Sequence, residues 1–299
     1  MYSNHFRACK WLLEVIKDNK QITLKSIASL WKKDEDLSGG LEMLPKHFHR
    51  CKKSLKTDFG IDICCKAGGD YAYFIANPEI LKDINLPEWM LSTLATGEKL
   101  HGCMALKDYI ILEPIPSGED RLDCVTDAML AHRKLEFDYQ KYGSIERKTV
   151  VLGICGLILY KRCWYILGEF EDKSRFTYAL DRMWNLKVSH QDFMMDSHFN
   201  VKAYFSEFYG IFNSGREMMS IVLRAFGTEA YRMRNQRIHH SQQEIGSGEG
   251  YTDFMIKVRP NNELMSLILS RKDLLKVLSP DSYEAEIKAA IEAMMELYV

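Results

Sequence analysis

Basic side chains between residues 42 and 56 have the types and the spacing needed to contact nucleic-acid phosphates. This segment holds five Lys or Arg and one acidic residue, a net charge of +4 in a chain whose total is −1. At about 100° per residue in a helix, Lys46, Arg50 and Lys53 share one side, and His49 and Lys56 flank them. The opposite side is apolar, with Phe48, Cys51, Leu55 and Phe59. A basic face of this kind fits the major groove of double-stranded DNA.

A charged face is also the ordinary means by which a surface helix stays hydrated, so the segment alone leaves two interpretations open. Its single sign, inside a near-neutral chain, favours contact with DNA. Lys66 precedes a glycine pair at 68–69, where an expected hairpin would bring it to a DNA phosphate.

The eight cysteines have none of the sequence spacings that are typical of zinc motifs. There is no Cys-x-x-Cys pair, and the adjacent Cys64 and Cys65 would need distant partners, so we expect no metal. The chain also lacks a glycine-rich phosphate loop, Gly-x-Ser-x-Gly and His-Glu-x-x-His. We therefore expect no enzyme activity and no cofactor, with the thiols free in a reducing compartment.

Composition places the chain among ordinary globular proteins, with 46% hydrophobic and 27% charged residues, and excludes a disordered chain. The most apolar run, residues 150–160, is too short to span a membrane. Residues 1–20 carry charges throughout, which argues against a secretion signal. These observations predict a cytoplasmic protein with no membrane partner.

The basic segment belongs to an expected winged helix-turn-helix domain over residues 1–80. Apolar periodicity predicts a first helix near residues 6–16 and a second helix capped by Thr23. A loop at 34–40 leads to the basic helix, which begins near Pro45 and ends at Gly60. Strands at 61–63 and 71–75 complete the wing.

Two further β-containing regions follow a helical connector over residues 81–134. Residues 135–207 predict a small Sm- or SH3-like β-barrel of five short strands, at 135–140, 149–152, 157–160, 164–167 and 176–180. Residues 215–299 predict the ferredoxin-like order βαββαβ, with strands at 220–225, 238–245, 251–258 and 274–278 and helices at 229–235 and 262–271. The fold class is thus α+β and multidomain.

The end of the C-terminal region carries two more expectations. Residues 246–248 would form the turn between the middle strands. Ser279 and Pro280 would cap and open a last helix. The buried side of that helix would be Ile287, Ile291, Met294 and Tyr298.

Two segments of the expected barrel resemble the WYL domain family. They are Trp164-Tyr165-Ile166 within residues 156–168, and Leu180-Asp181-Arg182-Met183 within residues 178–183. The basic helix is similar to the recognition helix of such proteins, and residues 238–242 are similar to part of their C-terminal WCX extension. The resemblance implies a bacterial transcription regulator whose barrel binds a nucleotide or oligonucleotide effector.

The resemblance also implies an effector site between the Trp164-Tyr165 strand and the strand end at Asp181-Arg182. A base would stack on Tyr165, and the forked donors of Arg182, with Arg175 and Arg162, would hold phosphate oxygens. Trp164 could also contact the effector but is better explained as core, because neighbouring residues of a strand face opposite ways. An Asp181–Arg182 pair of purely structural role is the alternative for those two.

A second group of effector contacts is expected near the adjacent histidines at 239–240. One ring should face inward and one outward, and the outward ring with Arg234 would meet an anionic effector. A buried, hydrogen-bonded His239 is the alternative.

Two functions remain open from the sequence. The first is a homodimeric transcription regulator that binds double-stranded DNA and is controlled by the barrel's ligand, since one recognition helix covers too few base pairs. The second is a sensor of RNA or single strands that acts on a partner protein. The basic helix favours the first.

Overall fold

The computed structural model describes residues 4–66, 68, 70–82 and 85–298 and divides into two compact units, Met1–Leu112 and Glu113–Val299. Helices and antiparallel sheets occur in both, which confirms the α+β class. Among the described residues, none of the helices has both the length and the apolar character to cross a lipid bilayer.

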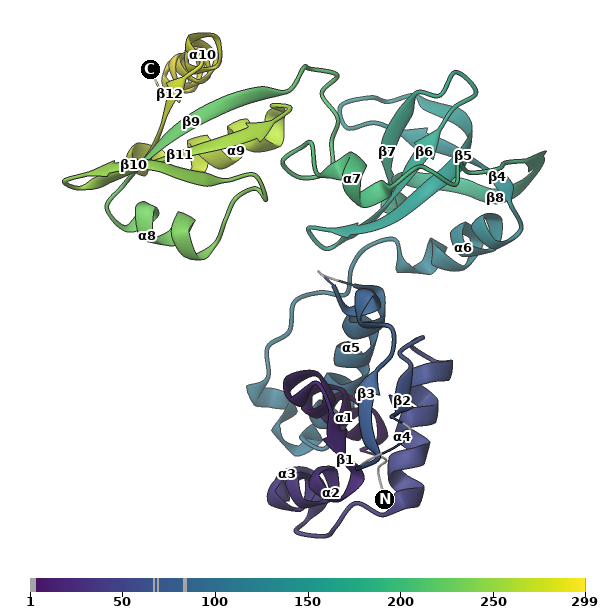
Figure 1. Ribbon diagram of the computed structural model, residues 1–299. Coiled ribbons are helices and arrows are strands. Elements are labelled where there is room, and N and C mark those ends of the chain that lie inside the picture. The colour runs from purple at the N-terminus through teal and green to yellow at the C-terminus, as the bar shows by residue number, and fades with distance from the viewer. Residues whose placement is uncertain (1–3, 67, 69, 83–84, 299) are drawn as a thin grey trace. The chain divides into compact units, whose positions relative to one another are not determined.

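The first unit packs helices around a small sheet of order β1-β3-β2 (Figure 1). Its strands are β1 (Ile22–Thr23), β2 (Ile63–Cys65) and β3 (Ala72–Ile75). Its helices are α1 (His5–Asn19), α2 (Leu24–Lys33), α3 (Glu35–Ser38), α4 (Pro45–Thr57) and α5 (Leu86–His101). Short 3-10 turns η1 (Pro78–Leu81) and η2 (Met104–Tyr109) flank α5.

Local sequence explains where these helices begin and end. Thr23 caps α2 as predicted, because its hydroxyl accepts a hydrogen bond from the Ser26 amide. Pro45 occupies the first turn of α4, and Gly60 leaves the helix at φ +68°. The loop predicted at 34–40 is wrong in part: Asp34 accepts a hydrogen bond from the Leu37 amide and starts α3. The hairpin's glycine pair lies partly outside the described residues, at position 69.

One core holds this unit together. The buried faces of α1, α2 and α4 meet the inner face of β2, and α5 adds Leu91. Leu12, Ile27, Phe48 and Ile63 have no exposed surface. This core fixes which side of α4 faces out.

The second unit begins with η3 (Glu119–Arg121) and α6 (Leu122–Leu130), followed by a five-stranded antiparallel sheet of order β7-β6-β5-β4-β8. Its strands are β4 (Arg133–Gln140), β5 (Arg147–Tyr160), β6 (Cys163–Glu169), β7 (Arg175–Ala179) and β8 (Met183–Asp192). The 3-10 turn η4 (Leu180–Arg182) joins β7 to β8. Asp181 and Arg182 therefore lie in this turn, not on a strand end.

The predicted strands at 149–152 and 157–160 are a single strand, β5. A bulge between Ile154 and Gly156 bends it, so its first half pairs with β4 and its second half with β6. β8 was not expected, because the polar end of the strand and Asn185 at φ +50° hide its alternation.

The C-terminal part of this unit has strands in the order β10-β11-β9-β12 and follows α7 (Val201–Phe205). Along the chain come β9 (Met219–Phe226), α8 (Thr228–Asn235), β10 (Gln243–Gly248), β11 (Tyr251–Val258), α9 (Asn262–Ser270), η5 (Lys272–Leu274), β12 (Leu275–Ser279) and α10 (Asp281–Glu296). Side chains of α8, α9 and α10 share one core with the sheet.

Three expectations about this part are wrong. The strand predicted at 238–245 begins only at Gln243, because the Gln242 side chain accepts a hydrogen bond from the Ile238 amide and holds a turn there. Residues 246–248 lie inside β10, and the chain reverses at Gly250, whose φ is +80°. Ser279 ends β12 and makes no cap for α10.

The predicted burial of one side of α10 is also wrong for the second half of the helix. Tyr283 and Ile287 are buried, but Ile291, Met294 and Tyr298 are 44%, 48% and 89% exposed. The apolar side of α10 therefore continues past the core that it covers.

Candidate nucleic-acid and effector sites

The basic face of α4 is fully exposed in the first unit. Lys46, His49, Arg50, Lys53 and Lys56 all point to solvent, while the opposite side of the helix is buried. Lys56 forms an ion pair with Asp62 at 2.9 Å, which raises the pKa of Lys56. Within the described part of the chain, no side chain pairs with those of Lys46, Arg50 or Lys53. Three cations on one side of one helix are thus available to a partner.

Lys66 follows β2 in the hairpin. Its amide donates to the Ala72 carbonyl at 2.9 Å, and its side chain is exposed. The hairpin therefore carries a cation where the sequence expected one.

The second unit contains a cavity of about 300 Å³ beside β7, near the lower end of ligand-pocket volumes. Its lining combines cations with aromatic rings: Tyr139, Lys141, Arg175, Phe176, Thr177, Tyr178, Arg182, Phe212 and Asn213. Cations beside exposed aromatic faces are suited to a phosphate attached to a base.

Arg182 is the least satisfied group of this cavity. Its guanidinium carbon lies 4.0 Å from the centre of the Tyr142 ring and 5.2 Å from that of Tyr139. The Asp181 carboxylate is 4.0 Å from Nε, too far for a hydrogen bond. Nε is buried and has no hydrogen-bond partner among the described residues. An unsatisfied buried donor costs about 1–3 kcal/mol.

Arg175 is already engaged. It donates to the Glu169 carboxylate at 2.5 Å, and its guanidinium stacks 4.0 Å over the Phe199 ring. Burial of Glu169 raises the pKa of that carboxyl, but hydrogen bonds from Lys173 and Arg175 outweigh burial and leave the pKa below its ordinary value. Arg175 is therefore neutralised within the protein, whereas, of the described acidic groups, Arg182 has only the more distant Asp181 carboxylate beside it.

The other residues expected around the barrel's ligand do not line the cavity. Tyr165 is half-buried, and its ring meets that of Phe212 edge-on at 5.9 Å; burial raises the pKa of Tyr165. Trp164 is half-buried against the core of the sheet. Asp181 accepts a hydrogen bond from the Ser117 hydroxyl at 3.1 Å. Arg162 lies in the β5–β6 turn, exposed and 3.8 Å from Glu113.

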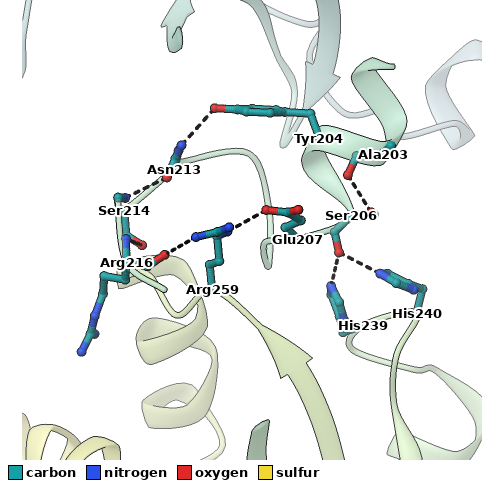
Figure 2. Close-up of polar contacts among 11 residues, drawn as sticks. Ala203, Tyr204, Ser206, Glu207, Asn213, Ser214, Arg216, His239, His240 and Arg259 are labelled. Atoms are coloured by element: carbon teal, nitrogen blue, oxygen red, sulfur yellow. Dashed lines mark hydrogen bonds and ion pairs between the residues drawn. The ribbon is translucent and has the colours of Figure 1, made fainter. Parts of the chain in front are cut away.

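The second group of expected effector residues is held in internal contacts. Arg234 pairs with Glu244 at 2.7 Å and also donates to the Thr252 hydroxyl. One ring faces inward and one outward, as the sequence predicted, but the buried ring is His239, the expected effector contact, and the exposed ring is His240. Figure 2 shows both rings reaching the carbonyl oxygen of Ser206, at 2.9 and 2.7 Å.

A carbonyl oxygen only accepts, so each Nε2 carries its proton there. Burial lowers the pKa of His239 and favours its neutral form. In Figure 2, Glu207 and Arg259 form a second tie at 2.6 Å between the 206–216 segment and the C-terminal strands. By binding the Ser206 carbonyl, these histidines fix one end of the 206–216 segment. The same segment contributes Phe212 and Asn213 to the lining of the cavity.

The comparison with family models decides the domain that surrounds the cavity. Residues 120–188 match the WYL domain. The matched residues run from η3 through β7 to the middle of β8, and they include Tyr139, Lys141, Arg175 and Arg182. Most of the cavity lining therefore lies within the residues that match the WYL domain, and Phe212 and Asn213 line it from beyond them.

Two solved structures are similar over most of the chain. Proteasome accessory factor B/C (PafBC) of Arthrobacter aurescens is 21% identical over 81% of this chain, with a TM-score of 0.33. A CRISPR Cas-related protein is 13% identical over 88% of this chain and 76% of its own, with a TM-score of 0.41. Both TM-scores are too low to show a shared overall fold. The chain spans only 39% of the PafBC chain. A comparison with curated proteins gives no significant match.

Sequence reasoning missed several residues that line the cavity, above all Lys141, Phe212 and Asn213. Lys141 directly follows β4 and had a detectable signal, since a cation at a strand end often faces a site. Phe212 and Asn213 gave none, because they belong to an irregular segment between two sheets.

Proposed function

We propose that this protein is a DNA-binding transcription regulator whose WYL domain senses an anionic nucleotide or oligonucleotide. Residues 1–80 would act as a winged helix-turn-helix and 81–134 as its connector. Residues 135–207 would form the Sm- or SH3-like sensing barrel, and 215–299 a ferredoxin-like WCX extension. We assign it no catalytic activity.

The exposed basic face of α4 carries this proposal. Its three unpaired cations lie on one helix, opposite a fully buried apolar stripe. A helix presented in this way inserts into the major groove, where cations meet phosphates and base edges. Lys66 in the hairpin would make a second contact, to the DNA phosphate backbone.

The test replaces Lys46, Arg50 and Lys53 together by Ala and measures binding to the DNA upstream of the protein's own gene. Each lost phosphate contact should reduce the slope of log affinity against log salt by about 0.9. The matched control replaces three exposed lysines outside α4, namely Lys82, Lys99 and Lys107. An α4 variant that keeps the wild-type slope and affinity would refute the DNA-binding assignment.

The unsatisfied Arg182 favours a second candidate, a sensor of RNA or single strands that serves a partner protein. Repeating the titration with single-stranded RNA and DNA, on wild type and on Arg182→Ala, separates the two candidates. If single strands bind through Arg182 and duplex DNA does not bind at all, the sensor is correct.

A homodimer is part of the proposed function, since two half-sites lie about 34 Å apart on DNA. The exposed apolar half of α10, with Ile291 and Met294, is available for contact with a second copy. Light scattering should give twice the chain mass of 34.8 kDa, and Ile291→Glu with Met294→Glu should halve it. A monomer at micromolar concentration, with and without DNA, would contradict the dimer.

A further inference from the structure

Two cysteines and a histidine from different helices meet inside the first unit. His5 and Cys9 stand one turn apart on α1, and Cys51 comes from the buried side of α4. Their ligand atoms all lie within 4.8 Å of one another. Both thiols are fully buried and His5 is half-buried. No disulfide joins the two cysteines.

The separation between Cys9 and His5 is close to that between two ligands of a tetrahedral metal ion. With zinc–sulfur bonds of about 2.3 Å and zinc–nitrogen bonds of about 2.0 Å, neighbouring ligand atoms lie about 3.5 Å apart. Cys9 Sγ is 3.7 Å from His5 Nε2 and 3.9 Å from Nδ1. The other two pairs of ligand atoms lie within 4.8 Å, so the three side chains would close around the ion.

The imidazole of His5 is held by a contact to α4. Nε2 lies 2.8 Å from the Ser54 hydroxyl, and both ring nitrogens lie within 3.9 Å of Cys9 Sγ, so Nδ1 is the nitrogen left for a metal ion. Metal-bound histidines typically engage their second ring nitrogen in this way, which fixes the ring and its tautomer. Ser54 is on α4, so the contact crosses the same helix pair.

The donor set is also chemically suited to zinc. Two cysteine sulfurs and an imidazole nitrogen are soft donors, which suit zinc better than magnesium or calcium. Metal binding would release the thiol protons to solvent.

We propose that His5, Cys9 and Cys51 bind one zinc ion, with water as the fourth ligand, and thereby join α1 to α4. The site would hold the helix that carries the basic face against the core of its own unit. The proposal does not depend on DNA binding, because its test measures metal uptake alone.

The experiment uses the full chain, reduced, freed of metal with a chelator and titrated with Co²⁺. We expect one equivalent to give a thiolate-to-cobalt absorption band, which Zn²⁺ then removes. The melting temperature should rise with Zn²⁺. Ser54→Ala should weaken binding about 10- to 100-fold, and His5→Ala should weaken it more.

His5 and Ser54 are half-buried, so both variants should keep their helical circular dichroism. Cys64→Ala with Cys65→Ala, on β2, is the control that should retain the band. The proposal fails if wild type takes up no Co²⁺ at one equivalent, or if folded His5→Ala binds as tightly as wild type. It also fails if the Cys64/Cys65 control loses the band.

Discussion

Glu169 is the most buried carboxylate near the cavity, and its side chain is only 2% exposed. It accepts hydrogen bonds from Lys173 at 2.8 Å and Arg175 at 2.5 Å. Glu169→Gln should therefore cost about 1–3 kcal/mol at pH 7, since hydrogen bonds between charged groups are the strong ones.

This cost should depend on pH in one direction. The pKa of Glu169 is lowered in the folded protein, so its contribution is present above the unfolded pKa of about 4.3. It is lost as pH falls through the lower folded pKa. Urea unfolding at pH 7 and pH 3 should show the gap between wild type and Glu169→Gln closing at pH 3. An equal gap at both values would contradict the ion-pair account, and exposed Glu171→Gln is the control.

For single residues, the sequence predicted the features that follow from the periodicity of one helix. The exposure of Lys46, Arg50 and Lys53 follows from the 3.6-residue period and the apolar stripe opposite. Proximity between distant residues has no such signal. His5 and Cys51 are 46 positions apart, and only the packing of α1 on α4 brings them together.

In the bent five-stranded sheet of the second unit, close packing leaves no room for a side chain at some glycine positions. A Cβ at Gly153 would overlap the Phe193 ring, in the stretch of β5 next to the bulge. Gly153→Ala should therefore destabilise the second unit by about 1–3 kcal/mol through overpacking.

The matched control is a glycine with free space and ordinary helical geometry. Gly97 lies within α5, and a Cβ there meets nothing within 4 Å. Gly97→Ala should stabilise the first unit by about 0.5–1 kcal/mol. Urea unfolding should thus shift the two midpoints in opposite directions. If Gly153→Ala is neutral, the bend in β5 does not need a glycine.

Elements whose period was regular were predicted well, and those shaped by their neighbours were not. α4 and β11 lie where apolar spacing placed them. The bend of β5 was read as a strand break, since a bulge interrupts alternation in the same way as a turn. The second half of α10 is apolar yet exposed, which periodicity alone cannot distinguish from a buried face.

For the whole molecule, the proposed function requires that the cavity and the basic face influence each other. They lie in separate units, Met1–Leu112 and Glu113–Val299. A ligand in the cavity can therefore alter DNA affinity only by binding two arrangements of the molecule unequally. Coupling free energies of about 1–3 kcal/mol are typical, which corresponds to a 5- to 150-fold change in affinity.

Adenosine monophosphate and a short single-stranded DNA are suitable probes, because each joins a phosphate to a base that could stack on the aromatic lining. We expect the bound probe to change the affinity for duplex DNA by such a factor, and bound duplex to change the affinity for the probe equally, since linkage is reciprocal. Arg182→Ala should weaken probe binding and remove the coupling, while Arg162→Ala, at the exposed β5–β6 turn, should preserve both. Calorimetry should measure the affinity of the protein for the probe with and without duplex DNA, and its affinity for duplex DNA with and without the probe.

Probe binding that survives Arg182→Ala unchanged would place the sensing site elsewhere in the second unit. Binding without reciprocal coupling would mean that the two sites act independently.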